Sequence, residues 1–205
     1  MHEIEIAYKC NWNCNYCCVE THTKKIISDQ EIINNFLGLK LKDTTLTISG
    51  GEPSYASDYI FDTIIEYCKQ FNIDLILNTN GRMFEKKSKY IKHFNKINYH
   101  CSENLEPIKI KKYNYPNIDY LLIVTDQNYY KLQSFIDINP GIYKIIPANN
   151  PYGVKAQELS IENYSEIFKR FYKYMTSESK LRFISKNKSF NDNDINYITN
   201  YKGNK

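Results

Sequence analysis

Three cysteines near the amino terminus are spaced so that a single loop could present three thiolates to one metal centre. They are Cys10, Cys14 and Cys17, in the pattern Cys-x3-Cys-x2-Cys. Three thiolates occupy three irons of a four-iron cluster and leave the fourth iron open, whereas a ferredoxin cluster or a structural zinc site normally has four protein ligands. The spacing therefore predicts an iron–sulfur cluster that binds a further molecule at its open iron.

The other three of the six cysteines receive structural interpretations. Cys18 could be a fourth ligand, but neighbouring side chains in an extended chain point in opposite directions, so Cys17 and Cys18 would rarely both reach one metal centre. Cys68 lies in a predicted amphipathic helix and Cys101 in a predicted strand, and free cysteines in such places are usually buried. If Cys18 were a fourth ligand, the chain would be a non-catalytic electron carrier or a zinc-binding interaction module, and this alternative stays open.

A second motif, Gly50-Gly51-Glu52-Pro53, follows a β-rich segment. Two glycines allow the backbone to approach a ligand closely and to expose its amide and carbonyl groups. Glu52 adds a carboxylate suited to an ammonium group, and Pro53 fixes the turn that follows. A simple turn would also explain these four residues, so the motif gains its significance from the cysteine loop that precedes it.

Strand and helix patterns alternate along the chain, which predicts an α/β fold with a parallel sheet. Six strand–helix units are too few for a closed eight-stranded barrel of ~250 residues, so the sequence predicts an open partial (β/α)6 barrel that is TIM-like. It also predicts a single domain at 1–205, with a core at about 1–176 and a carboxyl-terminal extension at 177–205. The predicted strands are 3–8, 44–49, 74–80, 97–102, 118–125 and 142–148. The predicted helices are one that begins at Ser28, and then 56–71, 85–94, 129–138 and 160–175. An extra strand at 181–185 and a helix at 192–201 are predicted to end the chain.

The motifs fall at one edge of this predicted sheet. In parallel α/β sheets, ligands bind beyond the carboxyl ends of the strands. The cysteine loop follows the first strand and the Gly-Gly motif follows the second. The third and fourth strands end in polar segments. Their convergence predicts a ligand site, and the two polar segments are Asn78-Thr79-Asn80-Gly81 and His100-Cys101-Ser102.

The sequence resembles the radical S-adenosylmethionine (SAM) family over most of its length, from the first strand to about the sixth. The resemblance rests on the three cysteines, on Tyr16 immediately before the third cysteine, on the Gly-Gly-Glu-Pro motif and on the end of the third strand. It implies a [4Fe-4S] cluster held by Cys10, Cys14 and Cys17. It also implies that the amino and carboxylate groups of SAM chelate the open iron.

The resemblance further implies which residues contact SAM. The fifth strand reads Leu-Ile-Val-Thr and lacks the Gly-x-Ile-x-Gly pattern of the family, so this chain departs from the family at the adenine contacts. The implied contacts are Gly50, Gly51 and Glu52 with the amino group, Tyr16 with the adenine, Asn80 and Ser102 with the carboxylate or the ribose, and the backbone near Val124 and near Ile146 with the adenine.

The activity implied by the resemblance is enzymatic. A reduced cluster would pass one electron to the sulfonium of SAM, giving methionine and a 5′-deoxyadenosyl radical that abstracts a hydrogen atom from a substrate. A flavodoxin- or ferredoxin-type donor would supply the electron, and the substrate would be a small molecule or a peptide. No cysteine follows Cys101, which argues against an auxiliary cluster domain of the kind found in many peptide-modifying members. An activase that installs a glycyl radical on a partner protein is the alternative enzyme.

The substrate-facing residues are less well defined. His100 shares a strand face with Asn98 and Ser102, and is the candidate proton donor or substrate ligand, although a structural histidine is the commoner case. Glu3 and Glu5 share one face of the first strand, where a solvated sheet edge explains them as well as a substrate role does. The segments 103–116 and 147–153 are the candidate substrate loops.

Composition excludes several other classes of protein. With 42% hydrophobic and 24% charged residues, the chain has the composition of an ordinary globular domain. Its formal net charge of +4 is too small to predict a nucleic-acid partner. No apolar run approaches the ~20 residues that span a bilayer. The amino terminus is not a secretory signal, so the sequence predicts a cytoplasmic protein without a membrane partner.

Overall fold

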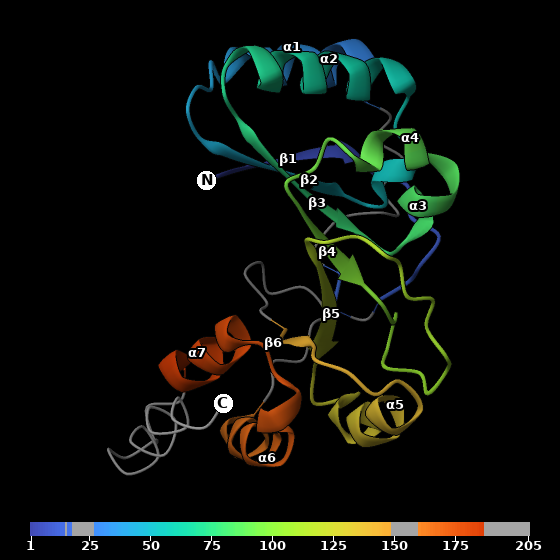
Figure 1. The fold of residues 1–205 in the computed structure, drawn as a ribbon, viewed down its shortest axis with the longest axis vertical. Coiled ribbons are helices and arrows are strands. Elements are labelled where there is room, and N and C mark those ends of the chain that lie inside the picture. Colours follow the sequence, from blue (N-terminus) through green and yellow to red (C-terminus); the bar gives the residue numbers. More distant parts are fainter. Residues whose placement is uncertain (15, 18–26, 149–159, 187–205) are drawn as a thin grey trace.

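The structure is a computed structural model that describes residues 1–14, 16–17, 27–148 and 160–186. Six parallel strands form one sheet whose spatial order is the chain order, from β1 to β6 (Figure 1). The sheet is open, with β1 and β6 at its two edges, which confirms the predicted open α/β architecture. The strands are β1 (His2–Ala7), β2 (Thr45–Gly50), β3 (Asp74–Thr79), β4 (Lys96–His100), β5 (Ile118–Val124) and β6 (Lys144–Pro147).

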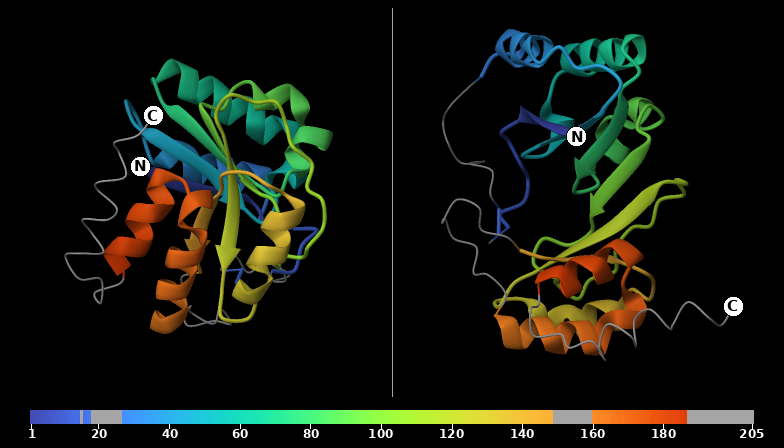
Figure 2. Two further views of the ribbon diagram at one scale, coloured as in Figure 1. Left: turned by 60° about the horizontal axis from the view of Figure 1, so that its bottom comes forward. Right: turned by 90° about the vertical axis from the view of Figure 1, so that its left-hand side faces the viewer.

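Most helices lie along the outer side of the curved sheet, whereas α7 lies beside the edge strand β6 (Figure 1). The chain that leaves β1 runs along the inner, concave side of the sheet (Figure 2). This arrangement leaves the inner face of the strands free to form a binding site. The α-helices are α1 (Asp29–Gly38), α2 (Asp58–Gln70), α3 (Arg82–Lys86), α4 (Ser88–Ile91), α5 (Leu132–Ile138), α6 (Ile161–Phe171) and α7 (Ser177–Lys186), and the 3-10 helices are η1 (Pro53–Tyr55), η2 (Tyr129–Lys131) and η3 (Tyr172–Tyr174).

Serine side chains define where the longer helices begin. The Ser28 hydroxyl accepts a hydrogen bond from the backbone N–H of Glu31 at 3.2 Å, and this confirms the predicted start of α1. The Ser57 hydroxyl accepts from the N–H of Ile60 at 3.3 Å in the same way at the start of α2. Each bond satisfies an N–H group that has no partner inside the helix, and so stabilises the helix at that residue.

The strands separate an apolar outer face from a polar inner face. Leu77 and Ile97 are fully buried in the cluster that packs under α1 and α2, and Leu122 is fully buried in a second cluster with α5 and α6. Asn78 and Asn98, which point to the opposite face, are only partly buried. Because side chains alternate along a strand, one face can build the core while the other remains available to ligands.

The predicted helix at 85–94 is wrong, because this segment forms two short helices, α3 and α4. The backbone at Lys87, with φ −137° and ψ 30°, leaves the helical region between them. Similarly, β4 ends at His100, so that Cys101 and Ser102 follow the strand rather than belonging to it. Both of these residues are buried, as predicted for Cys101.

The predicted strand at 181–185 is also wrong, because this segment lies inside α7. At the start of α7 the Thr176 hydroxyl accepts a hydrogen bond from the N–H of Ser179 at 3.3 Å. Phe183 is fully buried and stacks on Phe168 of α6. Packing of this kind stabilises a helix whose sequence alone gives a weak signal. The predicted helix at 192–201 lies outside the described residues.

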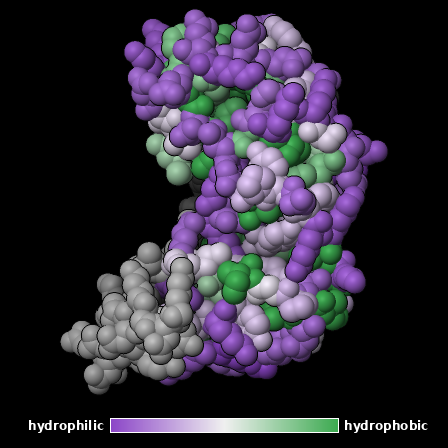
Figure 3. All heavy atoms as spheres, in the orientation of Figure 1, coloured by the Kyte–Doolittle hydropathy of each residue, from purple (hydrophilic) through white to green (hydrophobic). Residues whose placement is uncertain are grey.

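No helix in the described part of the chain combines the length and the apolar character that crossing a membrane requires. The face of the molecule in Figure 3 is mainly hydrophilic, with hydrophobic residues in separate patches.

Candidate functional site

A cavity of about 300 Å³ opens at the carboxyl ends of the strands, on the inner face of the sheet. Cys10, Cys14 and Cys17 all line it, as do Trp12 and Tyr16 from the same loop. The cavity also reaches both edges of the sheet, since residues of β1 and β6 contribute to its walls. The structure therefore brings the cysteine loop to the edge at which parallel sheets bind their ligands.

The two glycines that follow β2 hold the chain leaving β1. The N–H of Gly51 donates to the carbonyl of Ala7 at 2.6 Å, and the next N–H donates to the carbonyl of Lys9 at 2.8 Å. A Cβ atom on Gly50, where φ is +115°, would lie 2.3 Å from the Ala7 oxygen, and one on Gly51 would lie 2.5 Å from the Lys9 oxygen. Only glycine permits this approach, so the motif positions the start of the cysteine loop.

The carboxylate of Glu52 joins the ends of β2 and β3. It is 0% exposed and accepts hydrogen bonds from the backbone N–H groups of Ser54 (3.2 Å) and Asn80 (2.8 Å). The Thr79 hydroxyl lies 3.0 Å from both carboxylate oxygens. Burial raises the pKa of Glu52, and the N–H donors oppose that rise. The two preceding glycines line the cavity. The contact of the Glu52 carboxylate with an ammonium group stays a prediction.

Hydrogen bonds to sulfur fix part of the cysteine loop. The Cys10 sulfur accepts from the backbone N–H of Trp12 at 3.4 Å and from the side-chain amide of Asn80 at 3.7 Å. Burial raises the pKa of Cys14 to about 12, and a hydrogen bond with the Tyr16 hydroxyl opposes this rise. Burial also raises the pKa of Cys10. The thiols of Cys10 and Cys14 are therefore neutral at pH 7, and metal binding would have to displace their protons.

Three cysteine thiols that line one cavity are donors of the kind that bind an iron–sulfur cluster. In the described part of the chain, no three His, Cys, Asp or Glu side chains are grouped so that they could hold one metal ion. A cubane cluster takes its ligands at separate corners, so its thiolates need not meet at one point. The described cysteines are free thiols, and three of them line the same cavity.

A buried hydroxyl beside the cysteine loop has no hydrogen-bond partner in the described part of the chain. The Tyr16 hydroxyl donates to the backbone carbonyl of Ser102 at 3.4 Å, which ties the loop to the chain after β4. The Ser102 hydroxyl is buried, in a side chain only 4% exposed, and forms no hydrogen bond within the described residues. Such groups are rare in folded proteins and often mark the place of a polar ligand. Asn80 lines the cavity nearby, and its side-chain amide also donates to Asn11 at 3.0 Å.

His100 lines the cavity, but one of the two residues expected to frame the adenine does not. Desolvation lowers the pKa of His100 to about 4, so this imidazole is neutral at pH 7. Val124 is fully buried in the core on the outer face of the sheet. Ile123 and Ile146, which are register partners on β5 and β6, form an apolar wall of the cavity. The prediction for Val124 concerned its backbone, and it remains a prediction.

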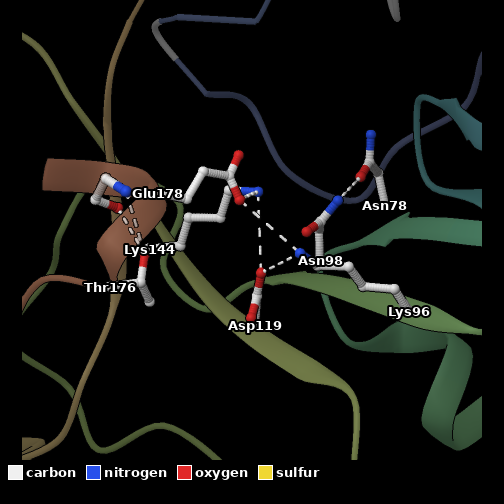
Figure 4. Close-up of polar contacts among 8 residues, drawn as sticks. Asn78, Lys96, Asn98, Asp119, Lys144, Thr176 and Glu178 are labelled. Carbon is white, nitrogen blue, oxygen red and sulfur yellow. Dashed lines mark hydrogen bonds and ion pairs between the residues drawn. The ribbon is translucent and has the colours of Figure 1, made fainter. Parts of the chain in front are cut away.

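Two asparagines form the polar floor of the inner face. The side-chain amide of Asn98 donates to the side-chain oxygen of Asn78 at 2.8 Å, and the two residues are register partners on β4 and β3 (Figure 4). The side-chain oxygen of Asn98 is buried and has no hydrogen-bond partner in the described structure. The sequence does not predict this pair, because the pairing depends on strand register.

Three charged residues lie on the inner face near the amino ends of β4, β5 and β6, and a glutamate on α7 contacts them (Figure 4). We call Lys96, Asp119, Lys144 and Glu178 the charged quartet. Lys96 is 2.8 Å from Asp119, Lys144 is 2.7 Å from Glu178, and both cross pairs are 3.9 Å apart. The Lys144 side chain is only 8% exposed, so its charge depends on these partners. The quartet attaches α7 to the sheet, and no sequence signal reveals it because its members come from distant segments.

Comparison with known proteins finds a matching family profile and solved structures with a similar fold. Residues 4–102 match the sequence profile of the Radical SAM superfamily. No protein with curated annotation matches the chain. A structure described as native anSMEcpe with bound AdoMet and Cp18Cys peptide has a TM-score of 0.57 and 19% identity, covering 84% of this chain and 59% of that chain. A second structure, of hexahistidine-tagged anSMEcpe with bound AdoMet, has a TM-score of 0.56 and 17% identity, covering 85% and 59%. At such identities the likeness establishes the fold, and the chain spans 59% of the length of both structures.

Proposed function

The chain belongs to the radical SAM superfamily through residues 4–102, and we propose that it is an enzyme that uses a [4Fe-4S] cluster to cleave SAM reductively. The cluster and SAM, when bound, supply methionine and a 5′-deoxyadenosyl radical, which takes a hydrogen atom from the substrate. Cys10, Cys14 and Cys17 hold the cluster. The observation that carries the proposal is that all three cysteines line one cavity at the carboxyl ends of the strands.

The amino group of SAM binds mainly to backbone groups of the glycine motif. Gly50 and Gly51 line the cavity, and glycine exposes backbone carbonyls that accept hydrogen bonds from an ammonium group. Glu52 is the positioning residue of this motif, because it is fully buried against the end of β3. Asn80 binds the carboxylate or the ribose of SAM, and its place in the cavity lining and its contact with the Cys10 sulfur support this role.

Residues after β4 and within β5 and β6, together with Tyr16, complete the proposed SAM site. The unpartnered hydroxyl of Ser102 holds the carboxylate or the ribose of SAM, and Tyr16 lies against the adenine. The backbone near Val124 and near Ile146 frames the other side of the adenine. His100, which is neutral in the cavity, faces the substrate as a ligand or proton donor.

The proposal extends to domain organisation and supply of electrons. Residues 1–205 form one radical SAM domain, with a core to about 176 and an extension from 177, where α7 begins. A single sheet that runs from β1 to β6 supports this division. A flavodoxin- or ferredoxin-type protein in the cytoplasm supplies the electron, because the cluster must be reduced before SAM is cleaved.

Anaerobic reconstitution with iron and sulfide tests the proposal. We expect the reconstituted protein to bind SAM with a change in the electron paramagnetic resonance spectrum of the reduced cluster. With dithionite it should form 5′-deoxyadenosine and methionine. The variant Cys14→Ala should lose the cluster, whereas Cys18→Ala should keep both the cluster and the cleavage of SAM.

Two other outcomes would favour the alternatives. A metal centre that is lost in Cys18→Ala, with a spectrum that does not respond to SAM, would indicate a non-catalytic metal protein and contradict the proposal. One deoxyadenosine for each activated site of a partner protein, rather than multiple turnovers on a substrate, would indicate a glycyl-radical activase.

A further inference from the structure

The chain that follows β4 holds the cysteine loop at two points. The backbone N–H of Asn13, which lies between the first two cysteines of the loop, donates to the carboxylate of Glu103 at 2.8 Å. The Tyr16 hydroxyl donates to the backbone carbonyl of Ser102 at 3.4 Å. The partners are 90 and 86 positions apart in the sequence. Both contacts are therefore products of the fold, and Glu103 brings a charge to one of them.

The contact with Asn13 places a negative charge beside the proposed cluster ligands, because Asn13 immediately precedes Cys14. The ion pairs of the described residues do not include Glu103. Lys9, the positive residue that leads into the loop, lies over the ring of Tyr55, with its nitrogen 4.9 Å from the ring centre. Within the described structure, no cation therefore neutralises the charge of Glu103.

Negative charge at this position opposes the reduction of a cluster. Reduction adds one electron to the cluster, and no bond forms or breaks in that step. A nearby carboxylate repels the added charge, and so lowers the reduction potential. The thiols are subject to the same influence: burial raises the pKa of Cys10 and of Cys14, and the charge of Glu103 adds to both rises. The charge of Glu103 therefore acts at both sulfurs.

A low potential suits the proposed reaction. SAM is cleaved when it receives one electron from the cluster, and a cluster of lower potential gives up that electron more readily. Nearby charge and hydrogen bonds to the sulfurs are two means by which a protein sets the potential. The backbone N–H of Trp12 donates to the Cys10 sulfur and stabilises negative charge there. The charge of Glu103 has the opposite effect, and so favours electron transfer to SAM.

We propose that Glu103 is a positioning residue that fixes the cysteine loop through the N–H of Asn13, and that its charge lowers the reduction potential of the cluster. This inference rests on the proposed function, because it requires the cluster that Cys10, Cys14 and Cys17 hold. A carboxylate that only anchored the loop could be replaced by a neutral acceptor without a change in potential.

Redox titration of the reconstituted protein without SAM tests the inference, with dithionite as the reductant and the electron paramagnetic resonance signal of the reduced cluster as the readout. Glu103→Gln removes the charge but retains an acceptor for the N–H of Asn13. At the midpoint potential of the wild type, we expect the ratio of reduced to oxidised cluster to be at least about threefold higher in this variant. Glu103→Asp keeps the charge and should return the ratio toward that of the wild type.

Two further measurements separate the effect of charge from that of structure. The Glu103 side chain is partly exposed, so added salt should reduce the difference between Glu103→Gln and the wild type. Glu66 is exposed on α2, and the matched control Glu66→Gln should leave the ratio unchanged. Iron and sulfide contents are measured in every sample.

Equal ratios in the wild type and in Glu103→Gln would overturn the inference, as would a lower ratio in the variant. Loss of the cluster in Glu103→Gln would also overturn it, because the charge would then be required for assembly of the cluster. These failures leave the cluster and SAM binding of the wild type intact. A wild type without a cluster, or with a cluster whose signal does not respond to SAM, would instead overturn the proposed function.

Discussion

The carboxylate of Glu52 accepts the backbone N–H of Asn80 at 2.8 Å, and this bond joins the end of β2 to the end of β3. Asn80 in turn donates to the Cys10 sulfur at 3.7 Å. A buried carboxylate that follows β2 is thus connected through two contacts to a proposed ligand of the iron–sulfur cluster. The stability of the strand ends and the geometry of the proposed metal site therefore both depend on Glu52.

Replacing Glu52 tests this connection. Glu52→Gln keeps the shape of the side chain but replaces one carboxylate oxygen with an amide NH2 group. This group would face the N–H and O–H groups that donate hydrogen bonds to the carboxylate. We expect the free energy of unfolding to fall by about 2 kcal/mol, since hydrogen bonds to charged groups contribute about 1.5–3 kcal/mol each. Urea denaturation measures the change, and Glu66→Gln on the exposed face of α2 is the control. Equal stability of the two variants would show that the buried hydrogen bonds contribute nothing.

Replacement by alanine should have opposite effects on stability at two glycines, because only Gly51 lies where β1 and β2 approach closely. Gly51→Ala would place a Cβ 2.5 Å from the carbonyl of Lys9, and should destabilise the protein by about 2 kcal/mol or more. Gly38→Ala at the end of α1 has no atom within 4 Å of the new Cβ. It should stabilise the protein by about 0.5–1 kcal/mol, because alanine favours helix. Thermal denaturation of both variants checks the pair, and a stable Gly51→Ala would contradict the proposed spacing.

The neutral state of His100 predicts a pH dependence. Desolvation lowers its pKa from 6.5 to about 4. Between these values the unfolded chain binds a proton that the folded chain does not, so stability falls as the pH is lowered from about 6.5 to about 4. The contribution is at most about 3 kcal/mol. His100→Gln should reduce this part of the pH dependence of unfolding, measured without cofactors, while His2→Gln at the exposed amino terminus should not. Identical pH profiles for wild type and His100→Gln would refute the prediction.

The charged quartet predicts a modest role of Glu178 in stability. Glu178→Gln removes the partner that lies 2.7 Å from the buried Lys144. Because the Glu178 side chain is 42% exposed, solvent screens the interaction, and we expect a loss of about 1 kcal/mol in urea denaturation. Glu166→Gln on α6 breaks only an exposed pair with Arg170, and should change stability by less than about 0.5 kcal/mol. A larger effect at Glu166 than at Glu178 would argue against the quartet as the attachment of α7.

Features that depend on local chemistry could be predicted from the amino-acid sequence. The spacing of Cys10, Cys14 and Cys17 identified a three-thiolate loop, and the structure places all three on one cavity. The alternation of strands and helices indicated six parallel strands in chain order, because consecutive strand–helix units pack side by side. The capping pattern at Ser28 located the start of α1, because a cap depends on residues only three positions apart.

Short segments were predicted less well, because packing outweighs their own preferences. Residues 181–185 combine a few apolar side chains in a stretch too short to reveal a period. They fold as part of α7, where Phe183 is buried against Phe168. The segment 85–94 carries helix-forming residues throughout, yet the backbone breaks at Lys87 to form two helices.

How distant residues combine became evident only in the folded chain. Folding directs Glu52 onto Thr79 and Asn80 rather than into the cavity. It also brings Glu3, Glu5 and Ile123 into the lining of one cavity, and assembles the charged quartet from separate segments. These contacts depend on the register between strands and on which face each residue presents. A shift of one residue in register would reverse that face, so such contacts are properties of the folded sheet and not of any local stretch of sequence.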